Sequence, residues 1–257
     1  MPMRIRHPVR PAARLQSTSP SNKRIPEPRM KLLIGNKNYS SWSMRPWVML
    51  TQFDIPFEEV MARFDSFEAD SRFKATVGAL SPAGKVPVLV DDDGLAVWDT
   101  LAIAEYVAEK FPGKALWPRD ARRRARARSV CAEMHSGFGA LRGAFGMNIE
   151  AALPEVGARV LAENAAARAD LARMIQLWQD TLAESGGPYL FGDYTIADAY
   201  FAPVVMRMRT YALPVPADVA AYIERAVAAK GTAAWIRGAL AEKDFLAFEE
   251  PYRQSRD

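Results

Sequence analysis

Three serine hydroxyls lie close together at the start of a predicted helix, on Ser40, Ser41 and Ser43. Serine is a favoured helix N-cap, but one side chain suffices to cap one helix. Capping alone therefore does not account for all three. A spare hydroxyl at this place can donate a hydrogen bond to a negatively charged ligand atom, which the positive end of the helix dipole also favours.

A second pair of residues with binding chemistry, Asp99 and Thr100, opens another predicted helix. Both side chains can cap that helix. The backbone N–H groups at a helix N-terminus also bind carboxylates, and a neighbouring hydroxyl adds a donor. From the residues alone we expect the pair to cap this helix.

Several other kinds of chemistry are excluded by residue type. The chain has one cysteine, Cys131, and two histidines, His7 and His135, so Cys-x-x-Cys and His-Glu-x-x-His motifs are both absent. Cys131 and His135 share a helical face, but two residues do not make a zinc site, and we predict no metal. No P-loop occurs, and no apolar run approaches the ~18 residues of a membrane span.

The net charge of +4 comes from the first 29 residues, which hold seven basic residues, one acid and many prolines. This composition predicts a disordered basic tail over 1–29, with Met30 as the alternative start of the protein. The rest has 27 basic and 29 acidic residues, which gives no electrostatic case for nucleic acid. Arg122–Arg128 lacks interleaved aromatic residues for base stacking, so we expect a solvated face with part of a dimer contact.

Residues 30–112 have the predicted order β-α-β-α-β-β-α. Strands are predicted at Lys31–Ile34, Ile55–Met61, Val86–Val90 and Leu95–Trp98. Helices are predicted at Met44–Gln52, in a polar stretch ending near Ala79, and at Leu101–Lys110. Pro46 is expected in the first turn of its helix, where no N–H bond is lost. The connections imply a parallel first pair of strands and an antiparallel second pair.

Strand signals end near Arg119, after the boundary at Leu116-Trp117-Pro118, and residues 119–250 are predicted to be helical. Helices are expected at Arg122–Phe138, Leu161–Glu184, Val219–Ala229 and Ala233–Glu242. Another opens with the capping box Thr195-Ile-Ala-Asp198, for which we predict a structural role. The predicted fold class is an α/β domain followed by an all-α domain.

Four ordered motifs resemble those of the cytosolic glutathione transferases. They are Ser40-Ser41-Trp42-Ser43-Met44-Arg45, similar to the Ser-Ser-Cys-Ser-Trp-Arg run of the zeta class, Ser81-Pro82-x-x-Lys85-Val86-Pro87-Val88-Leu89, Asp99-Thr100-Leu101-Ala102-Ile103-x-x-Tyr106, and Thr195-Ile-Ala-Asp198. The resemblance covers roughly residues 30–250. It implies a thioredoxin-like βαβαββα domain that binds glutathione at 30–112, and an all-helical domain with the second-substrate pocket at 119–250.

The resemblance also implies roles at the thiol. In the zeta-like pattern the first serine, here Ser40, donates a hydrogen bond to the sulfur of glutathione and favours the thiolate, which is the nucleophile. Ser41 is the next candidate. Tyr39 is a rival, because some classes use a tyrosine, but the tyrosine of those classes lies near the end of the first strand.

The rest of glutathione is assigned in the same way. Val86 is expected to pair through its backbone with the cysteinyl unit, beside a cis Pro87. Asp99 and Thr100 are expected to hold the γ-glutamyl group. Arg72, Lys74 and Lys85 are candidates for the glycyl carboxylate, and we select Lys85 because its spacing to Val86 is constant.

The implied function is a glutathione transferase, with glutathione as co-substrate and a small hydrophobic electrophile as its partner. The alternatives are a glutathione-dependent cis-trans isomerase of the maleylacetoacetate type and a non-catalytic binding module. Trp42 stands where the zeta pattern has cysteine and counts against the isomerase. Met134, Phe138, Phe145 and Met147, with His135, are candidates for the second-substrate pocket.

Assembly and location are predicted more coarsely. The resemblance implies a homodimer. A single cysteine and the lack of a secretory signal in residues 1–29 predict a cytoplasmic protein without membrane or nucleic-acid partners.

Overall fold

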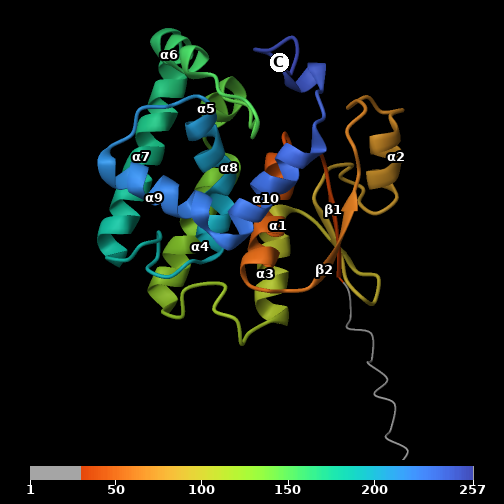
Figure 1. The fold of residues 1–257 in the computed structure, drawn as a ribbon. Helices are drawn as coiled ribbons and strands as arrows, with labels where there is room; N and C mark the ends of the chain where they lie inside the picture. Colours follow the sequence, from red (N-terminus) through yellow and green to blue (C-terminus); the bar gives the residue numbers. More distant parts are fainter. Residues whose placement is uncertain (1–29, 257) are drawn as a thin grey trace, which may run out of the picture.

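The computed structural model describes residues 30–256 (Figure 1). The predicted basic tail, 1–29, lies outside the described residues. The strands are β1 (Met30–Ile34), β2 (Phe57–Met61), β3 (Val88–Val90) and β4 (Ala96–Val97). The helices of this half are α1 (Ser41–Gln52), α2 (Arg72–Gly78) and α3 (Thr100–Lys110). The order of elements is the predicted one.

The strands form one mixed sheet in the order β2-β1-β3-β4. β1 and β2 are parallel, with Met30 opposite Phe57, while β3 is antiparallel to both β1 and β4. Both pairings implied by the sequence are therefore confirmed. Side chains alternate across the sheet, so Leu32 joins the core with α1 and α3, and Leu33 packs with Phe73 of α2 on the opposite face.

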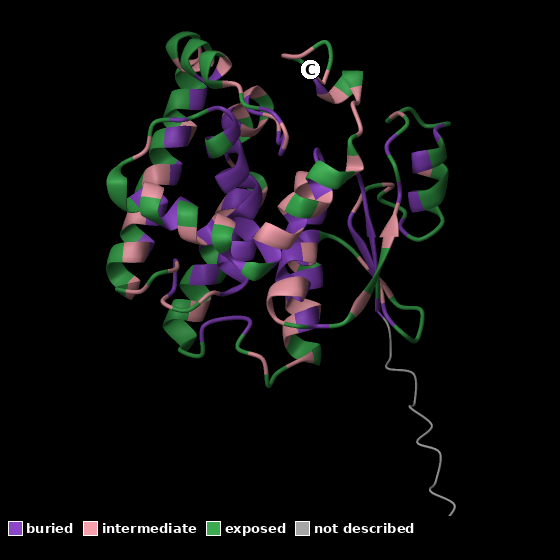
Figure 2. Ribbon diagram, viewed as in Figure 1, coloured by how far each residue is buried: buried purple, intermediate pink, exposed green. Residues whose placement is uncertain are grey.

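The second half is helical, and α1 and α3 lie between it and the sheet (Figure 1). Its elements are α4 (Ala121–Ser136), α5 (Gly139–Ala144), α6 (Pro154–Glu163), α7 (Ala165–Ser185), α8 (Ile196–Thr210), α9 (Ala217–Ala228), α10 (Lys230–Glu242) and the 3₁₀ turn η1 (Ala247–Glu249). Helix α8 is buried except at Arg209 and packs against α1, α4 and α9 (Figure 2). Among residues 30–256, no helix combines the length and apolar character needed to cross a bilayer.

The predicted capping box starts α8. The Thr195 hydroxyl accepts a hydrogen bond from the Ala197 N–H, and the Asp198 carboxylate accepts one from the Thr195 N–H at 2.9 Å. Burial raises the pKa of Asp198 to about 6. The capping box predicted from the sequence is therefore present at the start of α8.

Two helix predictions were wrong in their bounds. The stretch Leu161–Glu184 is divided between α6 and α7, because the Asn164 side chain accepts a hydrogen bond from the Ala167 N–H and caps a new helix. The apolar periodicity continues across this break and hides it. Helix α1 begins at Ser41, so Pro46 is its sixth residue and not in its first turn.

Candidate active site

Two adjoining cavities lie where the sheet half meets the helical half. The larger, of about 440 Å³, includes Ser40 and Ser41 in its lining, and the smaller, of about 310 Å³, includes Asp99 and Thr100. Trp42, Lys85 and Val86 line both cavities. The structure thus brings together the six residues selected from the sequence as the glutathione site, which are Ser40, Ser41, Lys85, Val86, Asp99 and Thr100.

Ser40 is the N-cap residue of α1, but its side chain forms no capping hydrogen bond. Its Oγ lies 2.7 Å from the Oγ of Ser43, which is fully buried and accepts a hydrogen bond from the Gly35 N–H at 3.1 Å. The helix therefore starts without using the Ser40 hydroxyl, and that hydroxyl lines the larger cavity.

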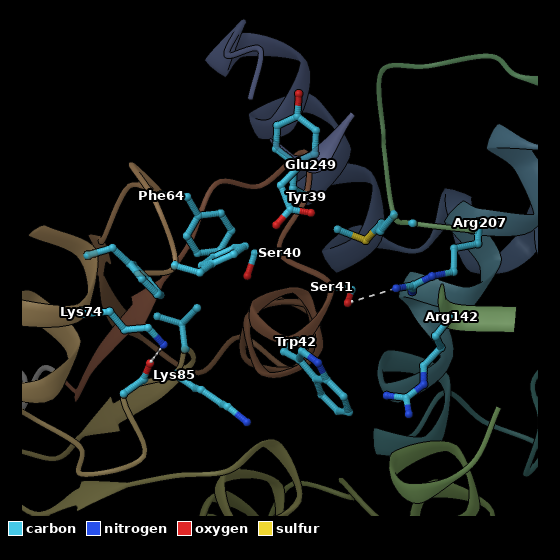
Figure 3. Close-up of a pocket in the computed structure, with 16 residues that line it drawn as sticks. Tyr39, Ser40, Ser41, Trp42, Phe64, Lys74, Lys85, Arg142, Arg207 and Glu249 are labelled. Carbon is cyan, nitrogen blue, oxygen red and sulfur yellow. Dashed lines mark hydrogen bonds between the residues drawn. The ribbon is translucent and has the colours of Figure 1, made fainter. Parts of the chain in front are cut away.

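Ser41 is the first residue of α1 and points to a different side of the cavity. Its Oγ accepts a hydrogen bond from Nη2 of Arg207 at 3.2 Å. Figure 3 shows Ser40 toward Lys85, and Ser41 toward Arg207 and Arg142. The two neighbouring hydroxyls therefore face opposite ends of the larger cavity.

Tyr39 also lines the larger cavity, but its hydroxyl donates to Oε1 of Glu250 at 2.7 Å. Burial and this hydrogen bond raise the pKa of Tyr39 to about 12. Its proton is committed to the Glu250 carboxylate.

Asp99 and Thr100 meet the helical half in the smaller cavity. Asp99 caps α3, with Oδ1 accepting from the Leu101 N–H, and its Oδ2 lies 3.1 Å from Nε2 of His135. The Tyr200 hydroxyl lies 2.7 Å from Nδ1 of His135 and 2.9 Å from the Thr100 hydroxyl. Helices α4 and α8 thus position the residues that open α3, and His135 lines this cavity, not the larger one.

The three basic candidates for a carboxylate lie differently. Arg72 lines neither cavity, its side chain is 93% exposed, and it pairs with Asp65. Lys74 donates to the Gly84 carbonyl at 3.0 Å. Lys85 is exposed and lines both cavities, next to the Val86–Pro87 peptide, which is cis as the resemblance implies.

Arg45 joins α1 to α8 beneath the site. It is fully buried, donates to the backbone carbonyls of Tyr200 and Ser41, and stacks on Trp42 with its guanidinium carbon 4.2 Å from the ring centre. Burial lowers the pKa of Arg45 to about 10. This arginine holds the Trp42 ring between the two cavities.

Sequence reasoning missed three of the charged residues that line the larger cavity. They are Arg142, Arg207 and Glu249. The signal for Arg207 was an arginine within an otherwise apolar helical stretch. Conversely, of the four apolar residues expected there, only Met147 lines the cavity, while Met134, Phe138 and Phe145 are buried in the core.

Two family models match the chain, one to each half. The glutathione S-transferase N-terminal domain matches residues 39–110, and the glutathione S-transferase C-terminal domain matches residues 150–238. With the mixed sheet and the helical half described above, these matches show that the chain belongs to the glutathione S-transferase family. The predicted fold class is confirmed.

Curated relatives match about two fifths of the chain. A probable maleylacetoacetate isomerase of Caenorhabditis elegans is 35% identical over 99 residues, which are 38% of this chain and 44% of that protein. The glutathione S-transferase GstB of Escherichia coli (strain K12) is 31% identical over 37% of this chain and 45% of its own length. Maleylacetoacetate isomerase of Pseudomonas aeruginosa is 39% identical over 40% of this chain and 47% of its own length. The chain thus aligns with less than half the length of these relatives.

Solved structures match most of the chain. A glutathione transferase homolog from Burkholderia GL BGR1, with bound glutathione, has a TM-score of 0.63 and 24% identity, over 83% of this chain and 99% of that one. A bacterial maleyl pyruvate isomerase of the zeta class has a TM-score of 0.61 and 22% identity, over 84% of this chain and 100% of that one. These likenesses establish the shared fold.

Proposed function

We propose that the protein is a glutathione transferase in which the Ser40 hydroxyl stabilises the thiolate of bound glutathione. Residues 30–112 would bind glutathione, and residues 119–250 would supply most of the second-substrate site. The observation that carries this proposal is the convergence of all six predicted site residues on two adjoining cavities at the N-termini of α1 and α3.

The smaller cavity suits the γ-glutamyl end of glutathione. The N-terminus of α3 and the Thr100 hydroxyl offer donors for its carboxylate, and Asp99 offers an acceptor for its ammonium group. Lys85 stands free to meet the glycyl carboxylate where the two cavities join. With both ends held in this way, the sulfur would lie near Ser40.

The chemistry required of the protein is modest. A hydrogen bond from Ser40 and the positive end of α1 both favour the charged form of the thiol, so its pKa falls and its proton passes to solvent. The thiolate then attacks a carbon that bears a leaving group. A C–S bond forms, and the leaving group departs with the electrons of its broken bond.

Ser40 fits the activating role better than its two rivals. The Tyr39 hydroxyl donates a hydrogen bond to Glu250, and Ser41 faces Arg207 at the other end of the larger cavity. Among residues 30–256, the Ser40 side chain hydrogen-bonds to the Ser43 hydroxyl, to which it donates. Rotation of the Ser40 hydroxyl about its Cβ–Oγ bond would turn this proton to a sulfur atom, and the Ser40 oxygen could then accept from Ser43.

A glutathione-dependent isomerase is the second candidate, because two of the curated relatives are named as a maleylacetoacetate isomerase or a probable one. In this reaction the thiolate adds to one carbon of a conjugated cis double bond. The resulting single bond rotates, and loss of the sulfur restores the double bond as trans, with glutathione recovered. A cis-dienone diacid consumed without net loss of glutathione would identify the isomerase, whereas a stable adduct with an aryl halide would identify the transferase.

The proposal is tested by titrating glutathione at neutral pH, following heat and the ultraviolet absorbance of the thiolate, on the wild type, Ser40→Ala and Ser41→Ala. We expect all three to bind, and only Ser40→Ala to lose the thiolate signal. Its kcat/KM should fall on the order of 10- to 100-fold, the effect of one hydrogen bond to a charged group. A thiolate signal kept in Ser40→Ala and lost in Ser41→Ala would move the role to Ser41.

Failure of the wild type to bind glutathione would overturn the enzyme proposal and favour a non-catalytic binding module. We further propose that the protein acts as a cytoplasmic homodimer. Sedimentation equilibrium tests the assembly, with the mass of one chain as the contrary result.

A further inference from the structure

The larger cavity has two guanidinium groups on its helical side. Arg142 comes from α5 and Arg207 from α8, and Figure 3 shows both beyond Ser41, on the side of the cavity opposite Lys74 and Lys85. The Arg142 guanidinium lies over Trp42, 5.5 Å from the ring centre. The helical side of the cavity is therefore cationic as well as aromatic.

Neither guanidinium is neutralised by the described part of the chain. None of the ion pairs formed within residues 30–256 involves Arg142 or Arg207. Arg207, which is buried, donates to the Phe145 and Pro203 carbonyls and to Ser41. Nε of Arg142 is buried without a hydrogen-bond partner.

The surroundings of Arg207 include two further cations. Burial, followed by the nearby charges of Arg45 and Arg142, lowers the pKa of Arg207 to about 9. Glu249 lines the same cavity beside Tyr39, and burial, followed by the neighbouring Glu250, raises the pKa of its carboxyl group. A buried cluster of cations with an unmade hydrogen bond is unfavourable until an anion joins it.

We propose that Arg142 and Arg207 form an anion subsite for the second substrate, and that the electrophile carries a carboxylate, which the two guanidiniums and Ser41 hold beside the Trp42 ring. This inference rests on the proposed glutathione site and narrows its substrate from any hydrophobic electrophile to an acidic one. The two carboxylates of glutathione are assigned to α3 and Lys85, at the other end of the cleft. The arginines are therefore left for the second substrate. An arginine fork matches the two oxygens of a carboxylate.

The test compares two conjugates of glutathione that differ in one group. S-(4-carboxy-2-nitrophenyl)glutathione carries the carboxylate, and the corresponding carboxamide is neutral at that position. Calorimetric titration measures the Kd of each for the wild-type protein, so that the result does not depend on turnover. We expect the carboxylate to bind on the order of 10- to 100-fold more tightly, as one charge-assisted contact predicts.

Arg142→Gln should remove this preference, while the Kd values of the carboxamide conjugate and of glutathione stay within about twofold of wild type. Arg207→Lys retains charge but loses the fork, and should remove part of the preference. Arg126→Gln is the matched control, because Arg126 is exposed on α4 and lines neither cavity. Its binding should equal that of wild type.

Equal affinity of the wild type for the two conjugates, with glutathione still bound, overturns the anion subsite and leaves the transferase proposal standing. So does an Arg142→Gln protein that loses glutathione itself, since Arg142 would then serve the glutathione site. Loss of all binding in the wild type contradicts the proposed function and this inference together.

Discussion

The direction of one hydrogen bond decides whether Ser40 can act on a thiol. A hydroxyl has a single proton, so Ser40 donates either to Ser43 or to a sulfur atom. In the structure the Ser40 hydroxyl donates to the Ser43 oxygen, 2.7 Å away, which also accepts the Gly35 N–H. When Ser40 turns its proton to a bound sulfur atom, the Ser43 hydroxyl is placed to donate to the Ser40 oxygen in return. Ser43 is therefore a positioning residue in the proposed mechanism.

Replacing Ser43 with alanine tests this arrangement. Ser43→Ala should bind glutathione with little change, but the pKa of the bound thiol should rise by about 0.5–1, because Ser40 loses a polarising donor. The measurement is the thiolate absorbance as a function of pH. The reaction rate of the variant should be lower than that of wild type at neutral pH and should approach it as the pH is raised. Ser129→Ala, which removes an exposed serine from α4, serves as the control. A pH profile unchanged in Ser43→Ala would show that Ser43 only fills space.

At the scale of elements, α10 holds α1 and the loop that precedes it. Trp235 of α10 donates its indole N–H to the Lys37 carbonyl at 3.0 Å, and its ring lies 5.3 Å from that of Trp47 in α1. The two helices approach closely at Gly231, where an added Cβ would lie 2.3 Å from the Val48 carbonyl oxygen. Helix α10 thus sets the position of the loop that ends at Ser40.

Gly231→Ala should therefore lower the free energy of unfolding by about 1–3 kcal/mol, the usual cost of overpacking against atoms that cannot move away. Urea unfolding monitored by tryptophan fluorescence measures it. Gly143→Ala in α5 is the matched control, because its new Cβ meets no atom within 4 Å. That control should be neutral or stabilising by about 0.5–1 kcal/mol. Equal stabilities of the two variants would contradict the close contact.

At the scale of the molecule, the chain after α10 runs beside the sheet half and then turns back toward the helical half (Figure 1). Glu242, the last residue of α10, accepts the Lys37 N–H at 2.8 Å, and its other carboxylate oxygen is buried without a partner. Burial raises the pKa of Glu242 to about 7, and the negative end of the α10 dipole acts in the same direction. The junction between the two halves thus holds an acid that prefers to be neutral.

This raised pKa predicts a pH dependence of stability. Between pH 4.5 and 7 the folded protein retains a proton that the unfolded chain releases, so stability falls as the pH rises through this window and then levels off. Glu242→Gln keeps an oxygen for the Lys37 N–H and removes the charge. It should stabilise the protein at pH 8 by about 1 kcal/mol, after allowance for solvent screening, and have a smaller effect at pH 5.

Urea unfolding at both pH values measures the difference. Glu224→Gln, at an exposed position on α9, should change stability equally little at both. A Glu242→Gln protein less stable than wild type at pH 8 would show that the carboxylate is needed for an ion pair.

The sequence by itself determined the order of elements, the two strand pairings, the α8 capping box and the six residues that meet at the cavities. The elements and the capping box depend on local periodicity, turns and helix N-termini, whereas the six site residues were chosen from the motifs shared with the glutathione transferases. A residue beside a helix N-terminus keeps that environment wherever the helix packs. The start of α1 and the break at Asn164 were missed, because apolar periodicity does not show at which residue a helix is capped.

Only the tertiary structure decided what surrounds those residues. Arg142 and Arg207 lie on different helices and meet at one cavity, while Phe145, three residues from Arg142, lies in the core. Ser40 and Ser41 face opposite ends of the cavity because α1 is docked between the sheet and α8. Which face of a helix borders a cleft depends on how the helices pack against each other, and that arrangement is set by long-range contacts that no local pattern contains.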